Sequence, residues 1–291
     1  RYKDSFLFES VLRGEQVGRY SFIGFNALQT VSSDKVLEEL RQEIANLEDD
    51  SQEELPFFYK GFVGFFPFET FCEIEPSVKA KKMEKAFLYL VGNLIVFDHV
   101  KQKLFLIQNS LKEGFESNLD EVADIVNEVK QLARLDFDAQ ASVNHEFEKT
   151  GFYSNTGEEV FKELIVKAKE HIFEGNVFQM VLSHKFLKDF KGEALDPFLL
   201  YRILRTVNPS PYQFLFNYED EGENKTLVGS SPEMMVKSYK CAEGIKAQIN
   251  PIAGTYRRTH DAKKDAALKE KLLNDKKELA EHVMLIDLAR N

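Results

Sequence analysis

Apolar and polar residues alternate along this chain with two periods, one typical of strands and one typical of helices. Strand-like patterns cover residues 6–10, 19–24, 86–97, 103–108, 177–183 and 213–218. Helix-like patterns cover 35–45, 119–132, 157–173 and 197–205, and a further helix is predicted to begin near Lys276. The segment 57–71 is dense in Phe and Gly, and its Gly61 and Gly64 suggest strands whose backbones approach closely, although an aromatic core is the favoured interpretation.

Domain organisation is indicated by a loss of periodicity between residues 136 and 156. This stretch gathers Asp, Asn, Ser, Gly and Glu residues, which favour turns and irregular chain. We therefore predict a linker here, with one region over residues 1–140 and a second region over 150–291.

Two carboxylates, Glu278 and Glu281, share one side of the last predicted helix with Leu285 and Leu288. Residues 283–289 are almost all apolar, so we expect this helix to be buried nearly all round. Two inward anions then need a partner that offsets their desolvation. Mg²⁺ is a candidate, because it is held by one or two carboxylates and leaves positions for waters and an anionic substrate.

An alternative without a metal remains open for these two carboxylates. Asp275 and Glu278 have the spacing of a capping box, which by itself accounts for Glu278. Glu281 can pair with Lys277 one turn back. The small residues of 251–255, followed by Arg257 and Arg258, also suggest an anion site nearby.

Two other polar residues have both a structural and a functional interpretation. Gln179 interrupts the apolar run 177–183, and a buried glutamine there is favoured as a hydrogen-bonded core residue. Glu233 ends the Ser-rich turn 229–233, which is a reasonable place for a general acid or base, but this turn by itself favours a solvated glutamate.

Composition narrows the class of protein. The 291 residues are 43% apolar and 30% charged, as in a soluble globular protein, and no apolar run is long enough to cross a bilayer. The net charge of -10 argues against nucleic acid as the main partner. Two distant cysteines provide no disulfide framework, which fits a reducing, cytoplasmic compartment. Because the chain begins without Met and stops in mid-pattern, we expect one or both natural ends to be missing.

Seven short segments, taken in order, resemble the chorismate-utilising enzymes, and within them the large subunits of anthranilate synthase. They are FLFES (6–10), GRYSFIG (18–24), VFQMVLS (177–183), NPSPY (208–212), GSSPE (229–233), PIAGT (251–255) and KELAEHVMLIDLARN (277–291). The resemblance implies an α+β fold of two pseudo-repeated halves, with antiparallel sheets packed face to face, helices outside and an active site between the halves.

The same resemblance implies a reaction and its residues. Chorismate and ammonia give 2-amino-2-deoxyisochorismate, and pyruvate is then eliminated to leave anthranilate. By this resemblance Glu281 is a direct Mg²⁺ ligand with Glu278 as its companion, and Glu233 protonates the departing hydroxyl. Gly254 and Thr255 of the PIAGT segment bind chorismate, and Thr255 also takes part in catalysis.

Two positions distinguish branches of this family by their chemistry. Branches that add water carry a lysine base where this chain has Gln179, so Gln179 fits the aminating branches. Many aminodeoxychorismate synthases carry a nucleophilic lysine where this chain has Ala253, beside the substrate. Direct amination towards anthranilate is therefore favoured, with component I of aminodeoxychorismate synthase as the alternative.

The resemblance also implies partners and regulation. A glutamine amidotransferase subunit, component II, supplies the ammonia. A tryptophan site for feedback inhibition maps to Ser10, Pro211, Tyr212 and Gln213, although Gln213 stands where methionine is common. Because the family pattern continues beyond DLARN with further catalytic and metal-binding residues, a chain that ends at 291 is expected to be inactive. Such a fragment would only fold and bind tryptophan or a partner.

Overall fold

In a computed structural model of the chain, the structure describes residues 3–10, 18–47, 55–80, 82–112, 119–134, 151–190, 195–259 and 261–290. The helices are α1 Val36–Ala45, α2 Phe71–Ile74, α3 Leu119–Arg134, α4 Glu158–Phe173, α5 Pro197–Val207, α6 Ala262–Leu273 and α7 Lys276–Arg290, with a 3-10 turn at Phe68–Thr70. The strands are β1 Ser5–Glu9, β2 Tyr20–Ser33, β3 Phe62–Phe65, β4 Ala86–Asp98, β5 Lys103–Gln108, β6 Tyr153–Ser154, β7 Phe186–Leu187, β8 Tyr212–Asp220, β9 Glu223–Ser231, β10 Lys237–Cys241 and β11 Gly244–Gln248.

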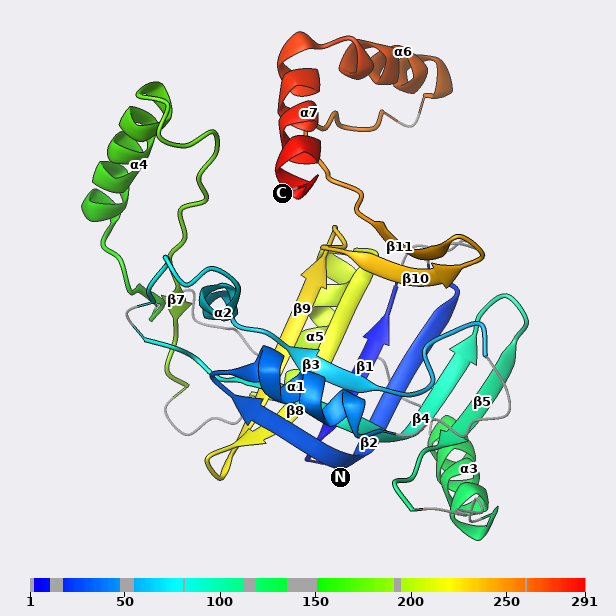
Figure 1. The fold of residues 1–291 in the computed structure, drawn as a ribbon. Coiled ribbons are helices and arrows are strands. Elements are labelled where there is room, and N and C mark those ends of the chain that lie inside the picture. The colour runs from blue at the N-terminus through cyan, green and yellow to red at the C-terminus, as the bar shows by residue number, and fades with distance from the viewer. Residues whose placement is uncertain are drawn as a thin grey trace. The chain divides into compact units, whose positions relative to one another are not determined.

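One antiparallel sheet of seven strands organises most of the described residues (Figure 1). Its order is β3-β4-β2-β1-β8-β9, and β5 also pairs with β4. The short strand β1 therefore lies between β2, which follows it directly, and β8, which lies about two hundred residues further along the chain. Figure 1 shows α5 against β8 and β9, while α1 packs on β2.

The sheet crosses the predicted division of the sequence. The chain forms two compact units, Arg1–Asn118 with Pro197–Asn291 and Leu119–Asp196. These units do not coincide with the regions 1–140 and 150–291. The division into those two regions therefore remains a prediction from the sequence. Most of the predicted linker, residues 136–156, lies outside the described residues.

The core of the sheet is centred on β4. This strand reads AFLYLVGNLIVFD, and nearly every position is buried because neighbouring elements cover both of its faces. Tyr89 is fully buried and its ring stacks on Phe216 of β8, with centroids 5.1 Å apart. The burial of these aromatic rings contributes to the stability of the sheet.

Close approach of the backbones explains a glycine in β3. A Cβ at Gly64 would lie 2.0 Å from the carbonyl oxygen of Phe87 on β4, so no larger residue fits without moving a strand. This confirms the close approach of backbones predicted at Gly64, whereas Gly61 precedes β3 and a Cβ there would meet only the ring of Phe58.

The helix predicted at 35–45 is confirmed as α1, but its start depends on a distant residue. The N–H groups of Val36 and Leu37 donate to the two carboxylate oxygens of Glu73, each at 3.1 Å. Glu73 belongs to α2, so it satisfies free amides at the first turn of another helix. No local pattern in the sequence indicates this contact.

The strand predicted at 177–183 is wrong. These residues form no strand, and Phe178 and Val181 are 79% and 86% exposed. In this unit the described strand pairing is the short ribbon of β6 and β7, which joins Tyr153 to Leu187. The apolar run has the composition of a strand, but within the described residues no neighbouring strand pairs with its backbone groups.

The helix predicted from Lys276 is confirmed as α7, but its predicted burial is wrong. No described residue of α7 is buried, and Leu279 and Val283 are about half exposed. The reason is that α7 packs mainly against α6 and not between several layers. No helix among the described residues is long and apolar enough to cross a membrane.

Candidate functional site

The segment 251–255 contacts the turn that carries Glu233. The backbone N–H of Ile252 donates to Oε1 of Glu233 at 3.2 Å. Glu233 follows β9, where the hydroxyl of Ser231 donates to the Glu233 carbonyl at 3.0 Å. The Ser-rich turn therefore fixes the backbone of Glu233, and the carboxylate, which is solvent-exposed, reaches the segment 251–255.

The same segment also meets α7. A Cβ built on Gly254 would lie only 1.9 Å from Oε2 of Glu278 and 2.4 Å from its Cδ. The carboxylate of Glu278 therefore occupies the space in which any other residue at position 254 would place its side chain. Glu233, Gly254 and Glu278, which lie far apart in the sequence, are brought together by one short segment.

Asp275 fixes the first turn of α7. Its Oδ1 accepts hydrogen bonds from the N–H groups of Lys277 and Glu278, at 3.0 and 3.2 Å. The predicted cap at Asp275 is confirmed, and it leaves the Glu278 side chain free to contact Gly254. Glu281 follows one turn later and is half-buried like Glu278.

The surroundings of Glu278 and Glu281 are compatible with a cation. Among the described residues neither carboxylate forms an ion pair, so the pairing of Glu281 with Lys277 is not observed. Two half-buried carboxylates one helical turn apart suit Mg²⁺, which needs only one or two of them. In the part of the chain that the structure describes, no three His, Cys, Asp or Glu side chains gather as a metal site.

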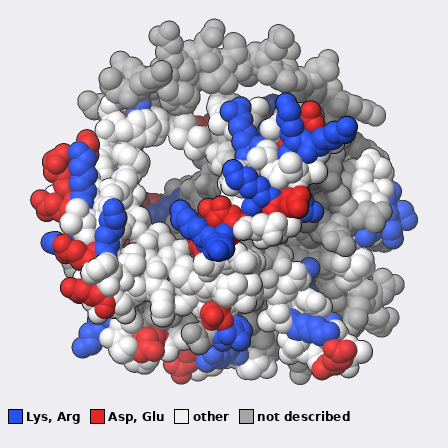
Figure 2. Space-filling model, turned by 90° about the horizontal axis from the view of Figure 1, so that it is seen from above, with Lys and Arg blue, Asp and Glu red and all other residues white. Residues whose placement is uncertain are grey.

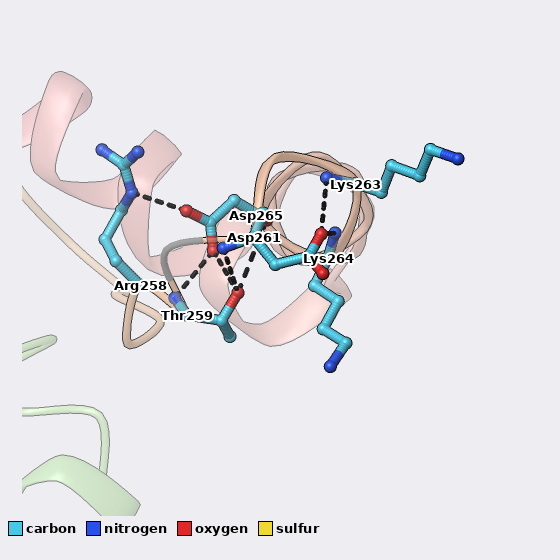
Figure 3. Close-up of polar contacts among 6 residues, drawn as sticks. All are labelled: Arg258, Thr259, Asp261, Lys263, Lys264 and Asp265. Atoms are coloured by element: carbon cyan, nitrogen blue, oxygen red, sulfur yellow. Dashed lines mark hydrogen bonds and ion pairs between the residues drawn. The ribbon is translucent and has the colours of Figure 1, made fainter.

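Arg258 forms an ion pair with Asp265 that has a structural role. Figure 3 shows its guanidinium on Asp265, with Nε 2.9 Å from Oδ2, and both the amide and the hydroxyl of Thr259 on the other carboxylate oxygen. The contacts from Thr259, followed by that from Arg258, lower the pKa of Asp265 to about 2. Asp261 caps α6 by accepting from the amides of Lys263 and Lys264. This cluster anchors the chain after PIAGT to α6.

On the face that Figure 2 shows, Lys and Arg side chains lie among Asp and Glu side chains over the described residues. The helices α6 and α7 contribute exposed lysines to their surroundings: Lys263, Lys264, Lys269, Lys271, Lys276 and Lys277. The same helices also carry acidic residues, among them Asp265, Glu270 and Asp287, so the local charge is mixed.

The predicted regulatory residues meet at the end of the β1–β8 pair. Glu9 is directly opposite Gln213, so Ser10 and Tyr212 come next along the two strands. Gln213 is only 2% exposed; its Nε2 donates to the carbonyl of Asn208 at 3.3 Å. Its Oε1 and the hydroxyl of Ser10 are buried without a hydrogen-bond partner among the described residues. Such unpaired buried atoms are costly, which favours a ligand there.

A buried polar cluster beside this strand end was not indicated by the sequence. The hydroxyl of Tyr201 on α5 donates to Oε1 of Glu9, and Nε of Arg205 lies 3.1 Å from the same oxygen. The pKa of Tyr201 is raised, mainly by burial of the hydroxyl and secondly by its hydrogen bond to Glu9. The signal that could have indicated a partner is Glu9 itself, a charged residue at the end of an apolar strand.

The remaining predicted site residues are placed as follows. Ala253 is half-buried and Thr255 is exposed, on either side of Gly254. Gln179 lies in the second compact unit and is exposed, so the core position favoured for it is wrong.

Comparison with known proteins agrees with these segments. A family model described as chorismate binding enzyme matches residues 5–291. The probable anthranilate synthase component 1 of Schizosaccharomyces pombe is 34% identical over 303 residues, covering 99% of this chain and 59% of the relative. Anthranilate synthase component 1 of Synechocystis is 32% identical, with 99% and 62% covered. The chain spans about three fifths of the length of these curated relatives.

Solved structures extend the comparison to the fold. The crystal structure of anthranilate synthase component I from Streptococcus pneumoniae matches with a TM-score of 0.68 at 27% identity, over 97% of this chain and 64% of that one. A putative 2,3-dihydroxybenzoate-specific isochorismate synthase from Bacillus anthracis matches with a TM-score of 0.53 at 18% identity, which supports the fold alone. The α+β class with antiparallel sheet is thereby confirmed. The chain belongs to the chorismate binding enzyme family.

Proposed function

We propose that this chain provides chorismate-binding and catalytic residues of an anthranilate synthase component I, which converts chorismate and ammonia into anthranilate and pyruvate. The observation that carries the proposal is the contact of segment 251–255 with both Glu233 and Glu278. The curated relatives named above support the choice of reaction, since they are anthranilate synthases at 32–34% identity.

In this proposal Glu233 acts as the general acid of the amination step. The nitrogen of ammonia forms a bond to C2 of chorismate, the ring double bonds shift, and the C4–O bond breaks. The hydroxyl leaves as water with the proton from Glu233, whose exposed carboxylate is held by the amide of Ile252. The C2 proton is then removed and the C3–O bond breaks, which leaves anthranilate. The departing enolpyruvate takes up a proton at its methylene carbon and becomes pyruvate.

We assign the orientation of the substrate and the choice of nucleophile to four residues of the chain. Gly254 offers backbone to chorismate and Thr255 offers a hydroxyl. Ala253 has no nucleophile that could form a covalent bond to C2, and Gln179 has no basic group that could deprotonate water. Ammonia, which needs no such base, is therefore the favoured nucleophile, and an aminodeoxychorismate product is not favoured.

We assign the metal-side carboxylates to Glu281 and Glu278. Their half-buried positions, one turn apart and unpaired within the described ranges, fit two ligands of Mg²⁺. When bound, Mg²⁺ would neutralise the substrate carboxylate and the charge that develops as the C4 oxygen departs.

We further propose a glutamine amidotransferase subunit as the ammonia source and the cytoplasm as the compartment. The term "component 1" in the names of the relatives implies a second component. Cys72 and Cys241 are both free thiols, which suits a reducing environment.

Feedback inhibition by tryptophan is proposed at the end of the β1–β8 pair. The unpaired Ser10 hydroxyl and Gln213 carbonyl oxygen would be satisfied by a polar ligand. Pro211 precedes β8 and Tyr212 begins it, and both provide apolar surface for an indole ring.

The reaction is tested by incubating the complete natural protein with chorismate, Mg²⁺ and ¹⁵N-ammonium and separating the products. We expect ¹⁵N-anthranilate. An aminodeoxychorismate product would place the chain in the alternative branch, and isochorismate would mean that water is the nucleophile.

A further inference from the structure

Gly254 is one of the glycines at which an added side chain would overlap with another residue. Its φ angle lies outside the left-handed region, so the backbone there is accessible to any L-residue. Glycine at this position is therefore not required by the conformation of the chain. What excludes a side chain is the carboxylate of Glu278, with Oε2, Cδ and Cγ at 1.9, 2.4 and 2.8 Å from the Cβ position.

The contact between Gly254 and Glu278 joins the segment 251–255 to the helix α7. Gly254 belongs to the segment that holds Glu233 through the amide of Ile252. Glu278 begins α7, with its amide fixed by Asp275. Because position 254 has no side chain, the Glu278 carboxylate of α7 can reach the backbone of the segment that contacts Glu233.

We propose that Gly254 is a positioning residue for Glu278. Because Gly254 has no side chain, the Glu278 carboxylate can lie against it, and α7, which carries the proposed metal ligands, is thereby coupled to the segment 251–255. This inference rests on the proposed function, because it takes Glu278 as part of the Mg²⁺ environment. It goes beyond that function by giving Gly254 a role that acts through Glu278 and not through the substrate.

A double-mutant cycle in the complete natural protein separates this role from a general structural one. The variants are Gly254→Ala, Glu278→Ala and their combination. An alanine at 254 has to displace the end of a flexible side chain, so we expect a correctly folded variant. With Mg²⁺ alone as the titrant, Gly254→Ala should weaken binding about tenfold, as loss of a positioning contact does. In the Glu278→Ala background the same change should have no further effect.

Thermal unfolding without metal gives a second readout of the same contact. Gly254→Ala should lower the unfolding midpoint when Glu278 is present and leave it unchanged when Glu278 is alanine, because the space is then vacant. Gly157→Ala is the matched control, since a Cβ there meets nothing within 4 Å, and it should leave Mg²⁺ affinity unchanged.

The outcomes distinguish this inference from the proposed function. If both cycles are additive, Gly254 does not act through Glu278 and the inference is overturned, whatever the enzyme makes. If the native protein binds no Mg²⁺, the assignment of Glu278 as part of a metal site fails. A non-additive unfolding cycle would then show only that Gly254 and Glu278 are in contact. Coupling in both readouts supports the inference.

Discussion

The amide of Ile252 donates to Oε1 of Glu233 across 3.2 Å, which ties the proposed acid to the segment beside it. Glu233→Gln keeps an acceptor oxygen for this bond but removes the transferable proton. We expect the turnover rate to fall about a hundredfold or more, with chorismate affinity and unfolding temperature nearly unchanged. Steady-state kinetics and direct chorismate titration measure the two effects.

Glu243→Gln is a suitable control for that variant, because Glu243 is an exposed carboxylate paired with Lys246. It should keep full activity. A Glu233→Gln enzyme with native turnover would exclude Glu233 as the acid.

The Arg19–Asp98 pair predicts how stability depends on pH. The bond from Arg19, together with the amides of Lys101 and Val100, outweighs burial and lowers the pKa of Asp98 from 3.8 to about 2. Because the folded pKa is the lower one, the contribution of Asp98 is complete above pH 4. It is lost as the pH falls from about 4 to 2.

Asp98→Asn tests this dependence, since asparagine retains an acceptor for the two turn amides but has no charge. Urea unfolding between pH 6 and pH 2 should show a smaller loss of stability for this variant than for the native protein. Parallel curves for the two proteins would contradict the assigned pKa.

Glu73 contributes to stability by binding the start of α1, which lies far from it in the sequence. Glu73→Ala leaves the first two amides of α1 without their acceptor, and we expect a loss of about 1 to 2 kcal/mol in the free energy of unfolding. Glu75, whose contacts are to Ser77 nearby, provides the control variant Glu75→Ala. Equal losses from both variants would mean that the cap at α1 contributes nothing.

Gln213 predicts a change in ligand affinity. Its buried Oε1 is unpaired within the described residues, and a methionine there would remove the acceptor that a bound ligand is proposed to satisfy. We therefore expect Gln213→Met and Ser10→Ala each to bind L-tryptophan several-fold more weakly than the native protein. Calorimetric titration would contradict this if both folded variants bound L-tryptophan as tightly as the native protein.

Local patterns were sufficient where structure is determined by nearby residues. The apolar run 86–97 predicts β4, and Asp275 predicts the start of α7, since a cap acts within one turn. The placement of Glu278 beside Gly254 follows from no pattern, because it depends on the path of the chain between them.

The predictions that failed depend on neighbours that a pattern does not contain. Residues 177–183 have strand composition, yet a strand forms only when another strand accepts its hydrogen bonds. The leucines of α7 indicate an inward face, but its burial depends on how many elements pack against it. The bond from Tyr201 to Glu9 likewise joins residues that only the folded sheet brings together.

The most direct measurement of the central claim is a continuous assay of the complete natural protein with chorismate, ammonium and Mg²⁺. We predict anthranilate fluorescence that rises together with an equal amount of pyruvate and is lost in Glu233→Gln. Pyruvate without anthranilate, or consumption of chorismate with neither product, would contradict the proposed reaction.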